Sequence, residues 1–352
     1  MLQDKTILHL FNLSLDLDNP VLATTNLWVN EFASHFETVN VYSTHVGRYE
    51  VLPNVNVFQL GGGTLKARIY ALTRLTILVP RVLHHRKQCV VFHHQSPRTA
   101  VFPGIFFRLF GITQGLWYSH SKKPFSLVFG SLIVNKIYSS SVHSLPMNTV
   151  KGNYFGHGVD TISATRASLE NQIRKNQILF VGRLDPIKRL EECICAVSKV
   201  PENDIEFVAV GPSSKHSSYL ESLDILSKKV KANFRCEEPI NHDQVFGRMA
   251  KSQMYFAGMR NSVDKSCLEA AASGCFVVTT DIDSAKLSGM TLFWDKFFGL
   301  DQLPSLENQI NLIKGMDRRF IEQARLEIQS NSARMNSASR LIRRISESLR
   351  EG

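Results

Sequence analysis

The sequence predicts an α/β protein made of two Rossmann-like domains, each a doubly wound parallel sheet. Three observations support this prediction. Short apolar runs that suit buried parallel strands alternate with longer stretches of helical periodicity. The chain has 352 residues, which is long for a single core and sufficient for two. Its 43% hydrophobic and 20% charged residues are typical of a soluble globular protein.

The first half of the chain is expected to contain six strands. The first covers residues 6–13 and is followed by a polar break at residues 16–20. A helix is predicted over residues 21–36, because its apolar residues fall mostly on one stripe. The other strands are expected over residues 39–43, 55–60, 89–93, 114–119 and 136–139.

The second half repeats this alternation. Strands are expected over residues 178–182, 205–210, 232–236, 253–257 and 276–280, with helices between them. In open α/β sheets, ligands bind beyond the carboxyl ends of the strands. We therefore look for functional residues directly after the strands in both halves.

The segment after the first strand of the second half carries two cations. An apolar run at residues 178–181 is followed by Gly182, which lets the backbone leave the sheet and pass close to a ligand. Pro186 suits the first turn of a helix. Arg183 and Lys188 are then expected at a strand end and a helix N-terminus, an arrangement that favours a diphosphate. The alternative is a strand–helix junction with two solvated cations.

A second segment places a carboxylate on a short helix. Residues 262–274 predict a polar loop and then a helix that ends at Gly274, and a buried strand follows. Glu269 lies near the start of this helix among small neighbours. Its carboxylate could accept hydrogen bonds from the hydroxyls of a ribose or a hexose. The alternative is an ordinary exposed glutamate.

Together these segments resemble the C-terminal half of the family 4 glycosyltransferases, which have the GT-B fold. The resemblance covers residues 153–281 well and the N-terminal half more loosely. It implies transfer from a nucleotide-diphosphate sugar with retention at the anomeric carbon, no metal ion and no other cofactor. The chain looks like a bacterial surface-polysaccharide type of member, serving a lipopolysaccharide, a capsule or another glycan. The motifs that carry the resemblance are residues 156–160 (GHGVD), 182–184 (GRL), Lys188, Gly211 and 268–274 (LEAAASG).

The resemblance assigns roles to individual residues of the second half. It implies that Arg183 and Lys188, next to Gly182, hold the donor diphosphate. Glu269 matches the second glutamate of the family's E-x7-E motif, which contacts the ribose. The position of the first glutamate holds Asn261, which is a departure from the pattern. Asp264, followed by Lys265, could supply the missing carboxylate from the same loop.

The first half offers weaker candidates. Family members have a glycine-rich loop after the first strand, whereas residues 15–25 contain no glycine. Thr24 and Thr25 are therefore candidates for acceptor contacts. His94 and His120 follow predicted strands, and histidine can exchange protons near neutral pH. His94 is the match to the family's histidine near the anomeric centre, although a lone histidine can also satisfy a core hydrogen bond.

Charge is distributed unevenly along the chain. The net charge is +10, and residues 51–159 contain no acidic residue. Residues 66–83 and 101–110 interleave cations with large apolar side chains, which favours the interface of an anionic membrane. One alternative is binding to nucleic acid, but no nucleic-acid motif accompanies the charge. Another is a packed helix whose cations face water. The basic residues in this part are Lys66, Arg68, Arg74, Arg81, Arg86, Lys87, Arg98, Arg108, Lys122, Lys123, Lys136 and Lys151.

Cysteine usage and hydropathy suggest a location. The six cysteines form no C-x-x-C pair and have no zinc-like spacing with histidine, so reduced thiols and no metal site are expected. The N-terminal residues do not resemble a signal peptide. The longest apolar run, residues 125–134, is too short to cross a bilayer. We expect a cytoplasmic protein that associates peripherally with the inner face of the membrane.

These inferences combine into one prediction. Residues 1–160 would form a basic acceptor-side domain, 161–335 a donor domain, and 336–352 a helix that crosses back to the first domain. The chain would move a sugar from a nucleotide sugar to a hydroxyl of a glycan acceptor, which we expect to be lipid-linked. Expected partners are the nucleotide sugar, the acceptor and an anionic membrane surface, without nucleic acid. Two alternatives are a degenerate, non-catalytic nucleotide-sugar-binding protein and a basic nucleic-acid-binding protein.

Overall fold

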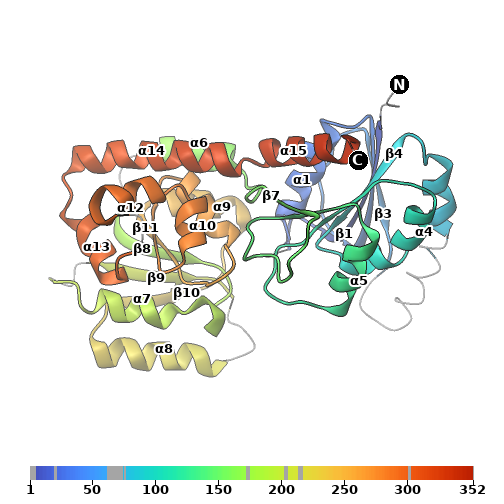
Figure 1. Ribbon diagram of the computed structural model, residues 1–352. Coiled ribbons are helices and arrows are strands. Elements are labelled where there is room, and N and C mark those ends of the chain that lie inside the picture. The colour runs from blue at the N-terminus through green and yellow to red at the C-terminus, as the bar shows by residue number, and fades with distance from the viewer. Residues whose placement is uncertain are drawn as a thin grey trace. The chain divides into compact units, whose positions relative to one another are not determined.

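The computed structural model describes residues 5–19, 22–61, 74, 77–171, 175–201, 205–212, 217–299 and 303–351. The chain divides into two compact units (Figure 1). Unit 1 comprises residues 1–158 and 338–352, and unit 2 comprises residues 159–337.

Unit 1 is built on a seven-stranded sheet in which every pair of neighbouring strands is parallel. The strand order is β3-β2-β1-β4-β5-β6-β7. The predicted strands of this half are all present, and β7 is an addition that the sequence did not suggest, because three residues carry no readable period. The strands are β1 (Ile7–Leu15), β2 (Thr38–Val46), β3 (Val55–Gln59), β4 (Cys89–His94), β5 (Gln114–Trp117), β6 (Lys136–Ser139) and β7 (Gly152–Tyr154).

Helices cover both faces of this sheet, as alternation along the strands requires. On one face, α1 (Thr24–Ala33) packs against α15 (Ala338–Glu351), and their apolar side chains share a core with Leu8, Leu10 and Val90. On the other face lie α3 (Pro97–Val101), α4 (Gly104–Leu109) and α5 (Phe125–Ile133), together with helical residues 77–84. The helix expected over residues 21–36 is shorter than predicted, and Val21 lies outside the described residues.

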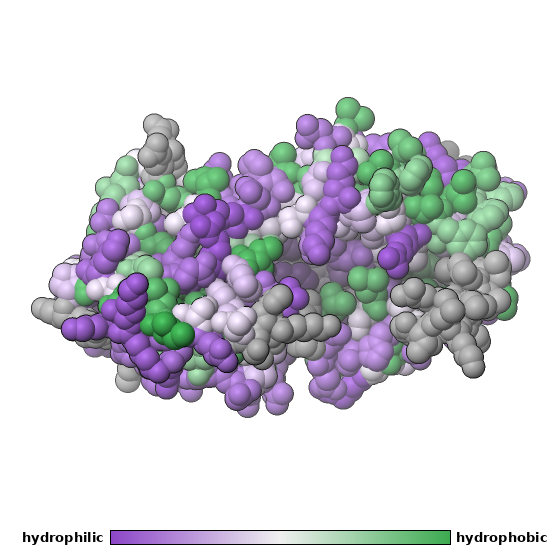
Figure 2. Space-filling view, turned by 90° about the horizontal axis from the view of Figure 1, so that it is seen from below, coloured by the Kyte–Doolittle hydropathy of each residue, from purple (hydrophilic) through white to green (hydrophobic). Residues whose placement is uncertain are grey.

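The surface of unit 1 is unusual for a soluble domain. Large apolar side chains on α4 and α5 are exposed, and hydrophobic residues gather on the unit 1 side of the molecule in Figure 2. Of the basic segment at residues 66–83, residues 66–73 and 75–76 lie outside the described residues. Among the helices described, none combines the length and the hydropathy that crossing a bilayer requires.

Unit 2 is built on a five-stranded parallel sheet in the order β10-β9-β8-β11-β12. The five strands correspond to those predicted, with bounds that differ by a few residues. Their apolar residues and those of the surrounding helices form the main core of the unit. The strands are β8 (Lys175–Val181), β9 (Glu206–Val210), β10 (Phe234–Glu237), β11 (Ser252–Ala257) and β12 (Phe276–Thr279).

The helices of unit 2 include one departure from the prediction. Pro186 opens a short 3-10 helix, η1 (Pro186–Lys188), rather than an α-helix. Arg189 follows in the left-handed region with φ 55°, and the α-helix begins only at Leu190. The helices are α6 (Thr161–Glu170), α7 (Leu190–Val197), α8 (Ser217–Val230), α9 (His242–Ala250), α10 (Lys265–Ala272), α11 (Ile282–Leu287), α12 (Thr291–Phe298), α13 (Leu306–Gly315) and α14 (Arg318–Asn336).

Candidate functional site

Three neighbouring strands of unit 2 each run directly into a glycine. Gly182 follows β8, Gly211 follows β9 and Gly258 follows β11. A Cβ atom on Gly211 would lie 1.9 Å from the carbonyl oxygen of Gly182, and one on Gly258 would lie 2.3 Å from that of Lys188. Gly211 also has φ 151°, which disfavours any residue with a side chain. The carboxyl edge of this sheet therefore exposes closely packed backbone, to which a ligand can approach without meeting side chains.

The two predicted cations lie beside this edge in different states. Arg183 is exposed and forms no ion pair with any residue that the structure describes. Lys188 ends η1, and its side chain is only 12% exposed. Its Nζ lies 2.6 Å from Asp264 Oδ1 and 3.4 Å from Met259 Sδ. Arg183 can therefore meet an incoming anion directly, whereas Lys188 is already neutralised by a carboxylate.

Tyr255 joins the strand that leads to Arg183 to the helix that follows Asp264. Its hydroxyl oxygen lies 2.8 Å from Ser266 Oγ and 3.1 Å from the Val181 carbonyl oxygen, and it accepts a hydrogen bond from the Val181 N–H. Burial raises the pKa of this phenol well above its ordinary value, so it stays protonated. Sequence reasoning missed Tyr255, because a tyrosine within an apolar strand looks like a core residue.

Lys265 and Glu269 lie one turn apart on α10, inside unit 2. Glu269 is 6% exposed, so the interpretation as an exposed helix glutamate is wrong. Burial raises its pKa, while the positive charges of His242 and Lys265 act in the opposite direction. Burial lowers the pKa of Lys265 to about 8, an effect that Glu269 partly offsets. This helix thus holds a buried acid and a half-buried base, and it begins directly after Asp264, the partner of Lys188.

Asn261 has a conformational reason to be asparagine. Its φ is 56°, in the left-handed region that asparagine tolerates better than glutamate. Its N–H donates a hydrogen bond to Asp281 Oδ1 at 3.1 Å, and Asp281 in turn caps α11 through the Ser284 N–H. Asn261 is exposed, and the carboxylate of this loop that pairs with Lys188 is that of Asp264.

The candidates of unit 1 lie in contrasting environments. His94 ends β4 in a buried position, with its ring 4.6 Å from that of Trp28 between centroids. Thr24 and Thr25 form the first turn of α1 and are buried. His120 is exposed, and its Nδ1 accepts a hydrogen bond from the Lys122 N–H.

His93, the neighbour of His94, is a core residue. Its ring nitrogens lie 2.9 Å from Thr99 Oγ1 and 3.2 Å from Gln114 Oε1. Burial lowers its pKa to about 4, so it is neutral at physiological pH. Because successive strand residues point to opposite faces, His93 and His94 cannot share one role.

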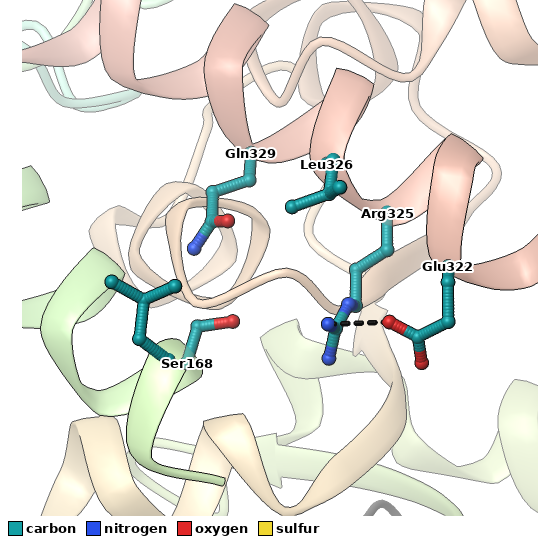
Figure 3. A pocket seen from close by; sticks show the side chains of 6 residues that line it. Ser168, Glu322, Arg325, Leu326 and Gln329 are labelled. Atoms are coloured by element: carbon teal, nitrogen blue, oxygen red, sulfur yellow. Dashed lines mark ion pairs between the residues drawn. The ribbon is translucent and has the colours of Figure 1, made fainter. Parts of the chain in front are cut away.

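A cavity of about 280 Å³ lies elsewhere in unit 2, between α6 and α14 (Figure 3). It contains none of the predicted site residues. Arg325 is buried there and pairs through Nη2 with Glu322, while its Nε and Nη1 find no acceptor among the described residues. The lining residues are Ser168, Leu169, Glu322, Arg325, Leu326 and Gln329.

Metal ligands do not gather in the described part of the chain. No group of three or more histidine, cysteine, aspartate or glutamate side chains within it is arranged to hold a metal ion. The six cysteines all lie among the described residues and none of them forms a disulfide, and four of them are buried.

Comparison with known protein families gives a match within unit 2. Residues 175–292 match the family described as "Glycosyl transferases group 1". No curated protein matches the sequence. The resemblance that the motifs carried is thereby confirmed for the segment that holds Gly182, Arg183 and Glu269.

Solved structures match over nearly the whole chain. Anabaena Alr3699/HepE, in complex with UDP and glucose, is 14% identical with a TM-score of 0.69, and the match covers 98% of this chain and 99% of that one. A glycosyltransferase from Rickettsia africae ESF-5 is 13% identical with a TM-score of 0.70, covering 99% and 98%. Sucrose-phosphate synthase from Thermosynechococcus elongatus is 13% identical with a TM-score of 0.70, and the match covers 98% of this chain and 98% of that one. The predicted GT-B fold is confirmed.

Proposed function

We propose that this chain moves a sugar from a nucleotide-diphosphate donor to a hydroxyl of a glycan. The proposal starts from the GT-B fold of the chain and from the match of residues 175–292 to the group 1 glycosyl transferases. Unit 2 binds the donor and unit 1 the acceptor. The anomeric configuration is retained, and no metal ion takes part. The acceptor is lipid-linked, and the protein works in the cytoplasm at the inner face of a membrane.

The observation that carries this proposal is the carboxyl edge of the unit 2 sheet. Gly182, Gly211 and Gly258 open the backbone there, and Arg183 and Lys188 supply two cations beside it. Backbone N–H groups and cations at strand ends are what a diphosphate requires. The structures of Alr3699/HepE hold UDP with glucose and UDP-glucose, and we propose a donor of the same class here.

The two cations have distinct parts in the proposed reaction. As the glycosidic bond to the donor breaks, the diphosphate leaves with increased negative charge. Arg183 binds the diphosphate through its exposed guanidinium, which can form two parallel hydrogen bonds with phosphate oxygens. Lys188 exchanges Asp264 for the departing phosphate and so stabilises the transition state more than the bound donor. These charges do what a divalent cation would otherwise do, and this is why we propose a metal-independent reaction.

The remaining site residues orient the sugars. Glu269 accepts hydrogen bonds from ribose hydroxyls, with Lys265 one helical turn away to balance its charge. Asp264, once Lys188 has released it, becomes available to a ring hydroxyl of the transferred sugar. His94 contacts a hydroxyl of the sugar or the acceptor, while Thr24, Thr25 and His120 lie toward the acceptor.

A thermal-shift panel tests the donor assignment. The full chain is heated with UDP, GDP, ADP and CMP sugars, and the same series is run on Arg183→Ala and on Arg319→Ala, an exposed arginine at the start of α14. One nucleotide class should raise the melting temperature of the wild type and of Arg319→Ala but not of Arg183→Ala. At a hundredfold excess over Kd the stabilisation is about 2.7 kcal/mol. No shift with any donor, in the presence or absence of glycan acceptors, would refute the diphosphate site.

A second reading is favoured by one observation, the replacement of the first motif glutamate by Asn261. On that reading the chain binds a nucleotide sugar without transferring it. Donor binding with no transfer and no donor hydrolysis, across a panel of lipid-linked and free glycans, would select this alternative. Steeply salt-dependent binding to RNA or DNA, with no response to nucleotide sugars, would instead indicate a nucleic-acid-binding protein.

A further inference from the structure

We propose that unit 1 docks on an anionic lipid bilayer through the outward face of α4 and α5. This inference rests on the proposed function in one respect only: a lipid-linked acceptor would explain why the protein needs a surface that binds membranes. Lipid binding is measurable whether or not the chain transfers sugar. The surface, which we name the α4–α5 face, consists of Ile105, Leu109 and Phe110 from α4 and its C-cap and Phe125, Phe129 and Leu132 from α5.

Helix α5 exposes one stripe of large apolar side chains to solvent. Phe125, Phe129 and Leu132 follow the i, i+4, i+7 spacing of one helical stripe, and this stripe is exposed. Phe125 is 85% exposed and Leu132 is 70% exposed. The opposite stripe holds Leu127 and Gly130, and it packs on the sheet and on α3.

Helix α4 extends the same surface. It contacts α5, and a Cβ atom on its Gly104 would lie 3.6 Å from the side chain of Ile133 at the end of α5. Phe107 points inward to the core under the sheet, whereas Leu109 is 74% exposed and Phe110 is also exposed. Contiguous exposed apolar residues on two packed helices mark an interaction site rather than scattered surface residues.

The face is held rigidly, which lowers the entropic cost of docking. Lys151 donates hydrogen bonds to the carbonyl oxygens of Ser131, Leu132 and Val134, so its ammonium caps the C-terminus of α5. At the other end, Tyr118 donates a hydrogen bond to the Lys122 carbonyl. The turn between β5 and α5 is fixed by this bond.

Charge around the face selects an anionic bilayer as the occupant. Lys122 and Lys123 are exposed immediately before α5, and Arg98 and Arg108 are exposed on α3 and α4. No acidic residue occurs anywhere in residues 51–159, so nothing near these helices in sequence opposes the cations. Aromatic and aliphatic side chains flanked by lysine and arginine match the boundary between acyl chains and anionic headgroups. Alternative occupants of this face are a second copy of the chain and an acidic soluble protein.

The test measures binding of the full chain to lipid vesicles. Vesicles of phosphatidylcholine with roughly a third phosphatidylglycerol, an anionic fraction in the range that attracts basic proteins, are compared with phosphatidylcholine alone. The first variant replaces Phe125, Phe129 and Leu132 by glutamine. A matched control replaces three exposed apolar residues of unit 2, Leu169, Ile225 and Leu292, by glutamine. A third variant, Lys122→Gln with Lys123→Gln, isolates the charges.

Wild type and control should sediment with anionic vesicles, and the α5 variant should bind at least about tenfold more weakly, because three large apolar side chains no longer enter the interface. The affinity of the double lysine variant for anionic vesicles should fall roughly fivefold for each charge removed, and its binding should depend less steeply on salt. Unchanged melting temperatures establish that the variants are folded. Arg183→Ala should bind vesicles like the wild type, so failure of the donor site and failure of the docking face are distinguishable.

Two results would overturn the proposal. One is a wild type that does not bind anionic vesicles at low salt. The other is an α5 variant that binds them as well as the wild type does. If the wild type ignores vesicles and sedimentation shows a dimer that the α5 substitutions dissociate, the face joins two copies of the chain instead.

Discussion

At the scale of single residues, the glycines after β8 and β9 are the strictest requirement of the site. The carbonyl of Gly182 occupies the space that a side chain on Gly211 would need, 1.9 Å from its Cβ position. The obstacle is backbone, so it cannot rotate away as a side chain would. The ends of β8 and β9 can therefore approach this closely only when residue 211 is glycine.

Gly211→Ala should destabilise unit 2 by at least about 3 kcal/mol, because the overlap adds to an unfavourable φ. Urea denaturation followed through Trp294, the tryptophan of unit 2, measures the loss. The control is Gly247→Ala in α9, where a Cβ atom would meet nothing within 4 Å. That change should stabilise by roughly 0.5–1 kcal/mol. Equal effects of the two substitutions would contradict the steric account.

The ion pair of Lys188 with Asp264 illustrates what the sequence could and could not predict at this scale. Residue types and spacing identified Lys188, and the departure at Asn261 directed attention to Asp264. The sequence could not show that these two side chains bind each other at 2.6 Å, because the contact joins residues 76 positions apart. Gly258 was equally findable, since it too ends an apolar strand, yet only its contact with the Lys188 carbonyl reveals its role.

At the scale of elements, helix α10 carries two charged groups, Lys265 and Glu269, whose pKa values are shifted by loss of solvation. Lys265 is half-buried, and its loss of solvation lowers its pKa from 10.5 to about 8. Between these values the unfolded chain binds more protons at this site than the folded chain does. Above about pH 10.5 Lys265 is neutral in both states and does not destabilise the fold. As the pH falls toward about 8, the unfolded chain binds the proton first, and the free energy of unfolding decreases.

Lys265→Met removes this dependence while keeping a side chain of similar length. At neutral pH the variant should be more stable than the wild type by up to about 3 kcal/mol, from roughly 1.4 kcal/mol per pKa unit. The gap should narrow as the pH rises from about 8 to 10.5. Urea denaturation across that range measures it, with Lys228→Met on the exposed face of α8 as the control. A gap in stability that stays constant with pH would show that folding does not lower the pKa of Lys265.

Strands and helices differ in how well the sequence predicted them. Eleven strands were predicted, and most of them are apolar runs that end at a polar or glycine residue, whereas β7 spans only Gly152–Tyr154. The 3-10 helix at Pro186 was mistaken for the start of an α-helix. Proline favours either kind of first turn, and the left-handed backbone of Arg189 that separates the two follows from packing.

At the scale of the whole molecule, buried histidines distinguish the two units. His9 and His93 are both buried in unit 1, and burial lowers their pKa values to about 3 and about 4. Both are neutral in the folded state near pH 5, whereas the unfolded chain would protonate them below about 6.5. Stability from the neutral rings is present above about 6.5 and is lost as the pH falls toward about 4.

Unit 1 should therefore lose stability in mild acid, each histidine contributing roughly 1.4 kcal/mol per pH unit within its window. Hydrogen-exchange mass spectrometry of peptides from β1 and β4 follows the opening of this unit between about pH 6.5 and 4. His93→Gln should flatten the response, while His84→Gln, at an exposed position, should not. Identical acid responses of the wild type and His93→Gln would refute this origin of the acid sensitivity.

The return of α15 to unit 1 has a consequence for synthesis on the ribosome. Trp28, Val29 and Phe32 share their core with Leu341, Ile345 and Leu349, which are translated more than 300 residues later. At roughly 5–20 residues per second, the groove on unit 1 stays uncovered for at least about 15 seconds, while all of unit 2 emerges and can fold. A nascent chain therefore presents an open apolar groove to chaperones, and unit 1, although begun first, is completed last.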